Sequence, residues 1–394
     1  MVSLASLELL WLLLPVAAGS GWYLARRETA RRAAGRGRAE LRSDYFQGIN
    51  YLLNEQPDKA IEVFIKVLEV DSNTVETHMA LGSLYRRRGE VDRAIRIHQN
   101  VVARASGAGR QRLEALLELA QDHLSAGLLD RAEGLFQELA EDPTFRVQAL
   151  RQLIDIYEQE KDWKNAIATA RRLEQVTGNQ LESVIAHYVC EEAQQAFRQG
   201  EIESALALTD QALKIDPACV RASLLEGDAY AERGELDRAV AAYRKVEGQD
   251  SAYISESVDR LEACYRAGAV PADLAPYLGG LLARHGGTTT VLMLAELKRE
   301  QQGVDAAIAF LTDALHERMS VRAIDRLLEL EMDARPADSR EHLRILKELT
   351  TKLLDDRPVY QCTHCGFPAR ALHWKCPSCK HWNSVKPIQG LAGD

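Results

Sequence analysis

The sequence lacks the short motifs that mark the common classes of enzyme active site. Its 394 residues contain no glycine-rich phosphate-binding loop, no H-E-x-x-H motif and no G-x-S-x-G motif. Acidic residues are spread along the predicted helix faces, and no carboxylate pair is set apart by its surroundings, so we interpret them as solvated surface. We therefore expect a protein that is not an enzyme.

The chain also lacks a net positive charge and the patterning of β-strands. It has 49 basic against 58 acidic residues, for a net charge of -9, which argues against a general nucleic-acid binder. Before residue 355, apolar residues recur at spacings of three and four rather than two. We therefore predict an all-α body and no nucleic-acid partner.

A long apolar segment lies at the N-terminus. Residues 4–24 carry only one charge, Glu8, and this length is enough for a helix that crosses a bilayer, which needs about 20 residues. Arginines follow at once, at Arg26, Arg27, Arg31, Arg32, Arg36, Arg38 and Arg42. We predict a transmembrane anchor at residues 1–24 and a basic linker at 25–42, with everything after the anchor cytoplasmic. A cleaved signal peptide is the alternative, but its positive charges normally precede the apolar run.

The middle of the chain repeats with a period of 34 residues. Gly48, Tyr51, Ala60 and Phe64 are followed at this distance by Gly82, Tyr85, Ala94 and His98. This is the tetratricopeptide pattern, in which a small residue lets two helices approach and larger side chains fill the seam. Later copies include Ala120, His123, Ala132 and Phe136; Ile154, Tyr157 and Ala166; Ala193, Ala205, Ala212 and Pro217; Gly227, Tyr230, Ala239 and Tyr243; a degraded copy around Cys264 and Tyr265; and Ala295, Ala307 and Ala314. We predict an α-solenoid of about eight or nine helical hairpins over residues 43–355.

Turns between the helices share a pattern, as at residues 89–94, 127–132 and 234–239, where glycine is expected to end one helix and aspartate to cap the next. Three cysteines, Cys190, Cys219 and Cys264, lie among apolar neighbours of the helical pattern. We expect these cysteines to be packed in the core, and likewise His98 and His123, which occupy aromatic positions of the repeat.

Four cysteines near the C-terminus form two C-x-x-C pairs separated by ten residues: Cys362, Cys365, Cys376 and Cys379. Two such turns supply four thiolates at tetrahedral angles, which suits Zn²⁺ at about 2.3 Å. Four thiolates leave no position for water, so the predicted zinc is structural. Iron is the alternative, because a tetrahedral four-sulfur site accepts either metal. Two disulfides are a further alternative that this spacing disfavours.

The metal-binding module is predicted to span residues 356–394, including its tail. Gly366 is expected to allow a tight turn behind the first cysteine pair. Four aromatic residues, Tyr360, Phe367, Trp374 and Trp382, are expected to surround the cage, because so small a module has little core of its own. His364, His373 and His381 are available as substitute ligands, although four thiolates already close the site.

Together these features predict a binding protein. A solenoid of helical hairpins has a concave face that holds a peptide or a helix. A membrane anchor restricts such a solenoid to membrane partners, or to soluble proteins that it recruits to them, and so raises their effective concentration. We therefore expect an adaptor.

At full length, the chain resembles the lipopolysaccharide assembly protein B family of Gram-negative bacteria. The most specific carriers of the resemblance are residues 89–99, the segment 362–379 with its cysteines, and the tail at 386–391. In that family the C-terminal module is described as rubredoxin-like, and the four cysteines match its metal ligands one for one.

The resemblance implies a single-pass inner-membrane protein with a short periplasmic N-terminus and its bulk in the cytoplasm. It implies an adaptor that works with the membrane protease FtsH to promote degradation of the deacetylase LpxC. Membrane proteins that sense or export lipopolysaccharide are implied as further partners, and a homodimer is an open possibility. Two other functions are considered: a scaffold for lipopolysaccharide export enzymes, and an iron-dependent electron-transfer protein at the membrane.

Overall fold

The computed structural model describes residues 20, 22–24, 26–27, 44–54, 56–70, 75–105, 109–268, 274–336, 340–355, 357–391 and 393. The predicted anchor at 1–24 and basic linker at 25–42 lie for the most part outside these described residues. Within the described part of the chain, no helix has both the length and the apolar character needed to cross a bilayer. The chain divides into two units, Met1–Ile156 and Tyr157–Asp394, and each is described by itself.

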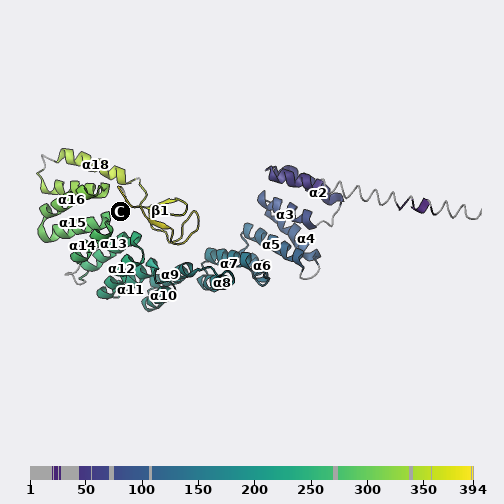
Figure 1. Cartoon of the computed structure of the whole chain (residues 1–394), viewed down its shortest axis with the longest axis horizontal. Coiled ribbons are helices and arrows are strands. Elements are labelled where there is room, and N and C mark those ends of the chain that lie inside the picture. The colour runs from purple at the N-terminus through teal and green to yellow at the C-terminus, as the bar shows by residue number, and fades with distance from the viewer. Residues whose placement is uncertain are drawn as a thin grey trace, which may run out of the picture. The chain divides into compact units, whose positions relative to one another are not determined.

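Helices make up nearly all of the described chain before residue 356 (Figure 1). A helix at residues 44–53 is followed in the first unit by α2 (Pro57–Val70), α3 (Val75–Arg87), α4 (Val91–Arg104), α5 (Arg110–Ser125) and α6 (Leu129–Leu139), and then by α7 (Arg146–Glu160). The second unit continues with α8 (Trp163–Thr177), α9 (Glu182–Arg198), α10 (Ile202–Ile215), α11 (Val220–Glu232), α12 (Leu236–Gln249), the short η1 (Ser251–Tyr253), α13 (Ile254–Arg266), α14 (Leu274–His285), α15 (Thr288–Gln302), α16 (Val304–Glu317), α17 (Val321–Ala334) and α18 (Glu341–Asp355). The predicted helical hairpins are confirmed.

Glycine is needed at some positions of the repeat because an aromatic ring fills the space beside it. A Cβ atom added to Gly82 of α3 would lie 2.4 Å from Nε2 of His98 on α4, and one added to Gly227 would lie 2.2 Å from the ring of Tyr243. His98 is fully buried, and its Nδ1 is 2.6 Å from Oδ2 of Asp122. The histidine is therefore a packed element of the repeat, as the sequence predicted.

The turns follow the prediction at their glycines but not at their aspartates. Gly89, Gly127 and Gly234 all adopt positive φ, between 72° and 86°, which ends the preceding helix at low steric cost. The helices that follow begin one residue before the expected aspartate, and their capping positions make no side-chain hydrogen bond. Asp92 and its counterparts instead lie in the first turn, where a negative charge favours the helix dipole.

First helices of successive hairpins touch one another in the second unit. The contacts run from α9 to α11, from α11 to α13, from α13 to α15 and from α15 to α17. Cys190 and Cys219 are buried in the cluster between α9 and α11, and Cys264 is buried between α13 and its neighbours, as predicted. These first helices form a continuous layer, and the C-terminal module lies against it.

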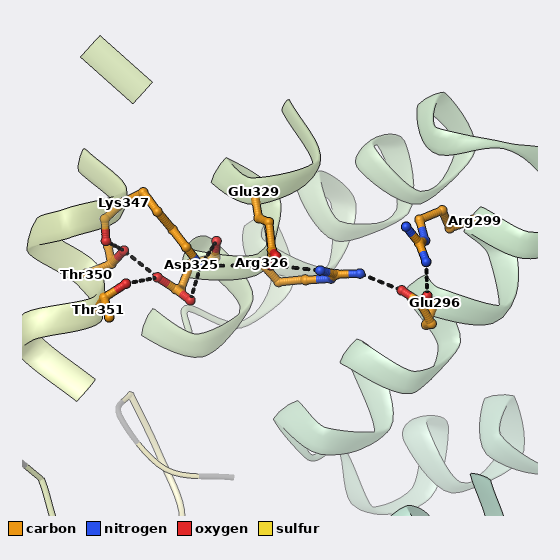
Figure 2. Close-up of polar contacts among 8 residues, drawn as sticks. All are labelled: Glu296, Arg299, Asp325, Arg326, Glu329, Lys347, Thr350 and Thr351. Atoms are coloured by element: carbon orange, nitrogen blue, oxygen red, sulfur yellow. Dashed lines mark hydrogen bonds and ion pairs between the residues drawn. The ribbon is translucent and has the colours of Figure 1, made fainter. Parts of the chain in front are cut away.

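Polar contacts connect the last hairpin to the solenoid (Figure 2). Asp325 of α17 accepts hydrogen bonds from Lys347 Nζ at 2.5 Å and Thr350 Oγ1 at 2.7 Å, both on α18. On the other side of α17, Arg326 Nη2 donates to Glu296 of α15 at 2.6 Å. The ladder links α15, α17 and α18 through side chains that are only partly exposed.

The C-terminal module holds the strands of the described chain. These are β1 (Tyr360–Cys362), β2 (Pro368–Ala369) and β3 (Val385–Pro387), which form an antiparallel sheet in the order β2-β1-β3. The module lies inside the curve that α9 to α18 form in the second unit (Figure 1). Only four residues separate the end of α18 from the start of β1.

The close approach at Gly82 predicts the effect of adding one methyl group. Gly82→Ala should lower the free energy of unfolding by about 1–3 kcal/mol, because Asp122 holds the His98 ring in place and the ring cannot move aside. Gly134→Ala, in the middle of α6 with open space around it, is the matched control and should stabilise by about 0.5–1 kcal/mol. Urea denaturation followed by circular dichroism measures both. Equal effects of the two substitutions would contradict the packing described.

Candidate metal centre

Two turns of the same hydrogen-bonding pattern present the four cysteines. In the first, the N–H of Cys362 donates to the carbonyl of Phe367 at 2.9 Å, and the N–H of Gly366 donates back to Cys362 at 2.9 Å. In the second, Cys376 and Lys380 make the equivalent bonds, to His381 and Cys376, at 2.9 and 3.0 Å. Gly366 has φ of 77°, as its predicted turn requires, and Lys380 takes the equivalent left-handed position with φ of 63°.

The structure brings the four predicted cysteines together. All four Sγ atoms lie within 4.8 Å of one another. The Sγ atoms of Cys362 and Cys379 are 3.7 Å apart, as are those of Cys365 and Cys376. A tetrahedral ion with metal–sulfur bonds of about 2.3 Å holds its sulfur ligands about 3.8 Å apart, whereas a disulfide bond is about 2 Å long. The thiols are free, and their arrangement fits a single metal ion.

The cage has a buried side and an open side. Cys362 and Cys376 are buried, Cys379 is half-buried and Cys365 is exposed. Burial raises the pKa of the Cys362 thiol, but hydrogen bonding with Ser384 and with the backbone N–H groups of the turn outweighs it and lowers the pKa to about 5. This thiol therefore favours the deprotonated form, which is the form that binds metals.

The module is docked on the solenoid through the carboxylate of Glu158, near the end of α7. Oε1 of Glu158 accepts hydrogen bonds from Tyr188 Oη and from Trp382 Nε1, both at 2.7 Å. Oε2 accepts from Lys375 Nζ at 2.6 Å. Only 9% of the Glu158 side chain is exposed, so its charge depends on these donors for its stability.

Two tryptophans of the module pack on the first-helix layer, which corrects the expectation that they surround the cage. The Trp382 ring stacks on His187 of α9 with centroids 5.3 Å apart. Trp374 lies 5.3 Å from Tyr253 and 5.8 Å from His187, and belongs to the core cluster of the solenoid. Tyr360 and Phe367 do pack beside the cysteines. The module gains its stability from the solenoid as well as from its own small core.

Further polar contacts extend this interface along the layer. Tyr253 Oη is 3.0 Å from both Asn383 Oδ1 and the carbonyl of Val385. Lys386 Nζ donates to Asp250 at 2.8 Å, and Tyr360 Oη donates to Glu256 at 2.5 Å. The partners on the solenoid side come from α7, α9, η1, α13 and neighbouring residues, so the module covers the first-helix face of this unit.

Sequence reasoning missed the residues on the solenoid side of this interface. Glu158, Asp250 and Glu256 are acidic residues on or beside helices, and in the sequence they resemble ordinary solvated carboxylates. The signal that was present lay in the module itself. Two tryptophans in a segment too small to bury them, Trp374 and Trp382, indicate a surface that docks onto something larger.

Comparisons with known proteins agree with this architecture. Residues 360–387 match the family model of the rubredoxin metal binding domain, and residues 77–112, 117–179 and 190–254 match models of the tetratricopeptide repeat. The lipopolysaccharide assembly protein B of Escherichia coli K12 is 37% identical over 98% of this chain and 100% of its own length. The chain belongs to the lipopolysaccharide assembly protein B family.

Other relatives of the family are similar along their whole length. The Haemophilus influenzae protein of the same name is 34% identical over 97% of this chain and 98% of its own.

Among solved structures, a tetratricopeptide repeat protein from Parabacteroides merdae has 12% identity and a TM-score of 0.34, with 79% of this chain and 98% of that chain covered. Within the family assignment, the cysteine quartet in its rubredoxin-like domain indicates a structural metal site.

The role of Glu158 is tested by replacing one of its acceptor oxygens. Glu158→Gln should lower the free energy of unfolding by about 1–3 kcal/mol, because an amide nitrogen cannot accept and at least one of the three donors loses its partner. Glu232→Gln, an exposed change of the same kind at the end of α11 in the same unit, is the control. Urea unfolding followed by tryptophan fluorescence reports the interface directly. A difference below about 0.5 kcal/mol between the two variants would contradict the docking role.

The buried His187 gives the interface a defined response to acid. Burial, and to a smaller degree the charge of Arg221, lowers its pKa to about 3. Since an unfolded histidine has a pKa of about 6.5, the stability gained from neutral His187 is complete above that pH and is lost as the pH falls toward 3. NMR of the imidazole should show no titration between pH 8 and 5 in the folded chain, and an ordinary midpoint in urea. A titration midpoint near 6.5 for His187 in the folded protein would show that its imidazole is not buried in the neutral form as described.

Proposed function

We propose that this protein is a non-enzymatic adaptor of the inner membrane that promotes proteolysis of the LpxC deacetylase by FtsH, and so regulates lipopolysaccharide synthesis. The observation that carries the proposal is its full-length similarity to proteins named lipopolysaccharide assembly protein B. The solenoid supports a binding role, since repeats of this kind present extended surfaces to other proteins. Membrane proteins that sense or export lipopolysaccharide are further partners in this proposal.

The proposed metal is zinc, held by Cys362, Cys365, Cys376 and Cys379. Four thiolates fill a tetrahedral shell and leave no position for water or substrate, so the ion stabilises the fold and takes no part in chemistry. The proposed division of the chain is an anchor at 1–24, a basic linker at 25–42, the solenoid at 43–355 and the metal module with its tail at 356–394. In this topology the short N-terminus is periplasmic and the remainder cytoplasmic.

Loss of the metal cage tests the adaptor function. Cys376→Ser should release the metal and lengthen the half-life of LpxC in cells to the value found without the chain, because the unfolded module no longer docks on the solenoid. Cys264→Ala is the matched control, since it replaces a buried cysteine of the solenoid that lies outside the cage. Pulse-chase measurement of LpxC, with the level of each variant followed by immunoblot, gives the result. If LpxC has the same half-life with a folded, metal-free variant as with the unmodified chain, the proposal is refuted.

The two other functions have distinct outcomes. A scaffold for export enzymes leaves LpxC turnover the same with and without the chain. An electron-transfer protein contains iron, so metal analysis of the chain purified from its native host would find iron together with reversible one-electron reduction. The four-thiolate shell accepts either metal, and the absence of a flavin or nicotinamide fingerprint elsewhere in the sequence, which would indicate a redox partner, favours zinc.

A further inference from the structure

Two histidines stack on the exposed side of the metal module. His364 lies within the first cysteine turn, and His381 follows the second turn. Their rings are 3.6 Å apart between centroids and inclined by 20°. Both side chains are exposed, and their nitrogens lie within 4.8 Å of each other and of Sγ of Cys379. Two potential nitrogen ligands, from His364 and His381, and one sulfur ligand, from Cys379, therefore lie together at the edge of the cage.

The hydrogen bonding of His381 leaves one nitrogen ready to bind a metal ion. Its Nδ1 is 3.0 Å from the carbonyl of Cys379. A carbonyl only accepts, so Nδ1 carries the proton and Nε2 keeps a free lone pair. A bond from Nδ1 to a backbone carbonyl is the arrangement that commonly orients metal-binding histidines. The backbone of His381 is fixed as well, since its carbonyl accepts from the N–H of Cys376 and from Ser384 Oγ.

A backbone hydrogen bond holds the first cysteine turn, which carries His364, next to the segment that carries His381. The N–H of Thr363 donates to the carbonyl of Ser384 at 2.7 Å, which places His364 over His381. A tetrahedral site of nitrogen and sulfur ligands needs metal–ligand bonds of about 2.0–2.3 Å. The three ligand atoms already lie within 4.8 Å of one another, and both rings are exposed and therefore have room to turn toward a shared ion.

We propose that His364, His381 and Cys379 form a second, solvent-facing position for a transition-metal ion of borderline softness, such as Zn²⁺ or Co²⁺, through which metal enters and leaves the cysteine quartet. The inference rests on the proposed metal centre. An ion arriving from water binds the two imidazoles and the sulfur of Cys379 first, and the proton on that sulfur goes to solvent. It then moves inward as the other three sulfur atoms replace imidazole and water, and each of them that is still protonated releases its proton to solvent as it becomes a ligand.

The burial of two of the four cysteines explains why an entry site on the exposed side of the cage is useful. Cys362 and Cys376 are buried, so an ion from solvent reaches them last. Cys379 belongs to both positions and carries the ion between them. Release follows the same route in reverse, so the histidines affect the rates of loading and loss in the same proportion and leave the final complex unchanged.

Stopped-flow loading of cobalt tests the proposal on the full chain in detergent, after removal of metal with a chelator under reducing conditions. The thiolate-to-cobalt absorption band reports arrival in the quartet. The double variant with His364→Gln and His381→Gln should load about tenfold more slowly and reach the same final absorbance. His373→Gln, an exposed histidine of the same module outside the cluster, is the matched control and should load at the normal rate.

Each result decides the question. Slower loading with an unchanged endpoint, mirrored by slower loss to a chelator, supports the entry site. Equal rates for the double variant and the control overturn it and leave the proposed metal centre standing. A reduced final absorbance in the double variant overturns it too, since the histidines would then be ligands of the final site. Absence of the band in the unmodified chain overturns both the entry site and the metal centre.

Discussion

The carboxylate of Glu158 is the interaction on which the arrangement of the second unit depends. A nearly buried negative charge is costly unless its oxygens are fully hydrogen-bonded. Glu158 meets this requirement with three donors from two sources: Tyr188 belongs to the solenoid, whereas Lys375 and Trp382 belong to the module. Neither part satisfies the carboxylate alone. The requirement that buried charges be paired therefore fixes how the metal module and the helical layer fit together.

The metal site and the solenoid consequently support one another. Lys375 and Trp382 are brought to Glu158 by the second cysteine turn, where they form an isolated bridge around Cys376 and Cys379. The proposed ion would join the two ends of this turn, and the turn in its folded form completes the interface. Because a structural ion contributes free energy only to the folded state, the proposed ion would stabilise the docked helices together with the module.

The repeats and the cysteine quartet could be predicted from the sequence because each depends on local spacing. Gly82 and His98 are separated by a fixed number of residues, and so are the two cysteines of each pair. The docking surface could not be predicted, because Glu158 and Lys375 are 217 residues apart and no local pattern relates them. The aspartate caps were predicted wrongly. The sequence pattern located each turn, but it did not show at which residue the next helix begins, and each helix begins one residue before the aspartate. His98 was correctly assigned to the core because it occupies an aromatic position of the repeat, and the three solenoid cysteines because they lie among apolar neighbours of the helical pattern.

The short connection between α18 and β1 has a consequence for how this protein meets others. The inner face of a helical-hairpin solenoid commonly receives a peptide, but in this unit the chain's own C-terminus fills it. A tether of four residues gives that occupant an effective concentration on the order of millimolar or higher. A free peptide with comparable contacts competes poorly at cellular concentrations, so proteins that bind this half of the solenoid meet its outer helices or the exposed edge of the module itself.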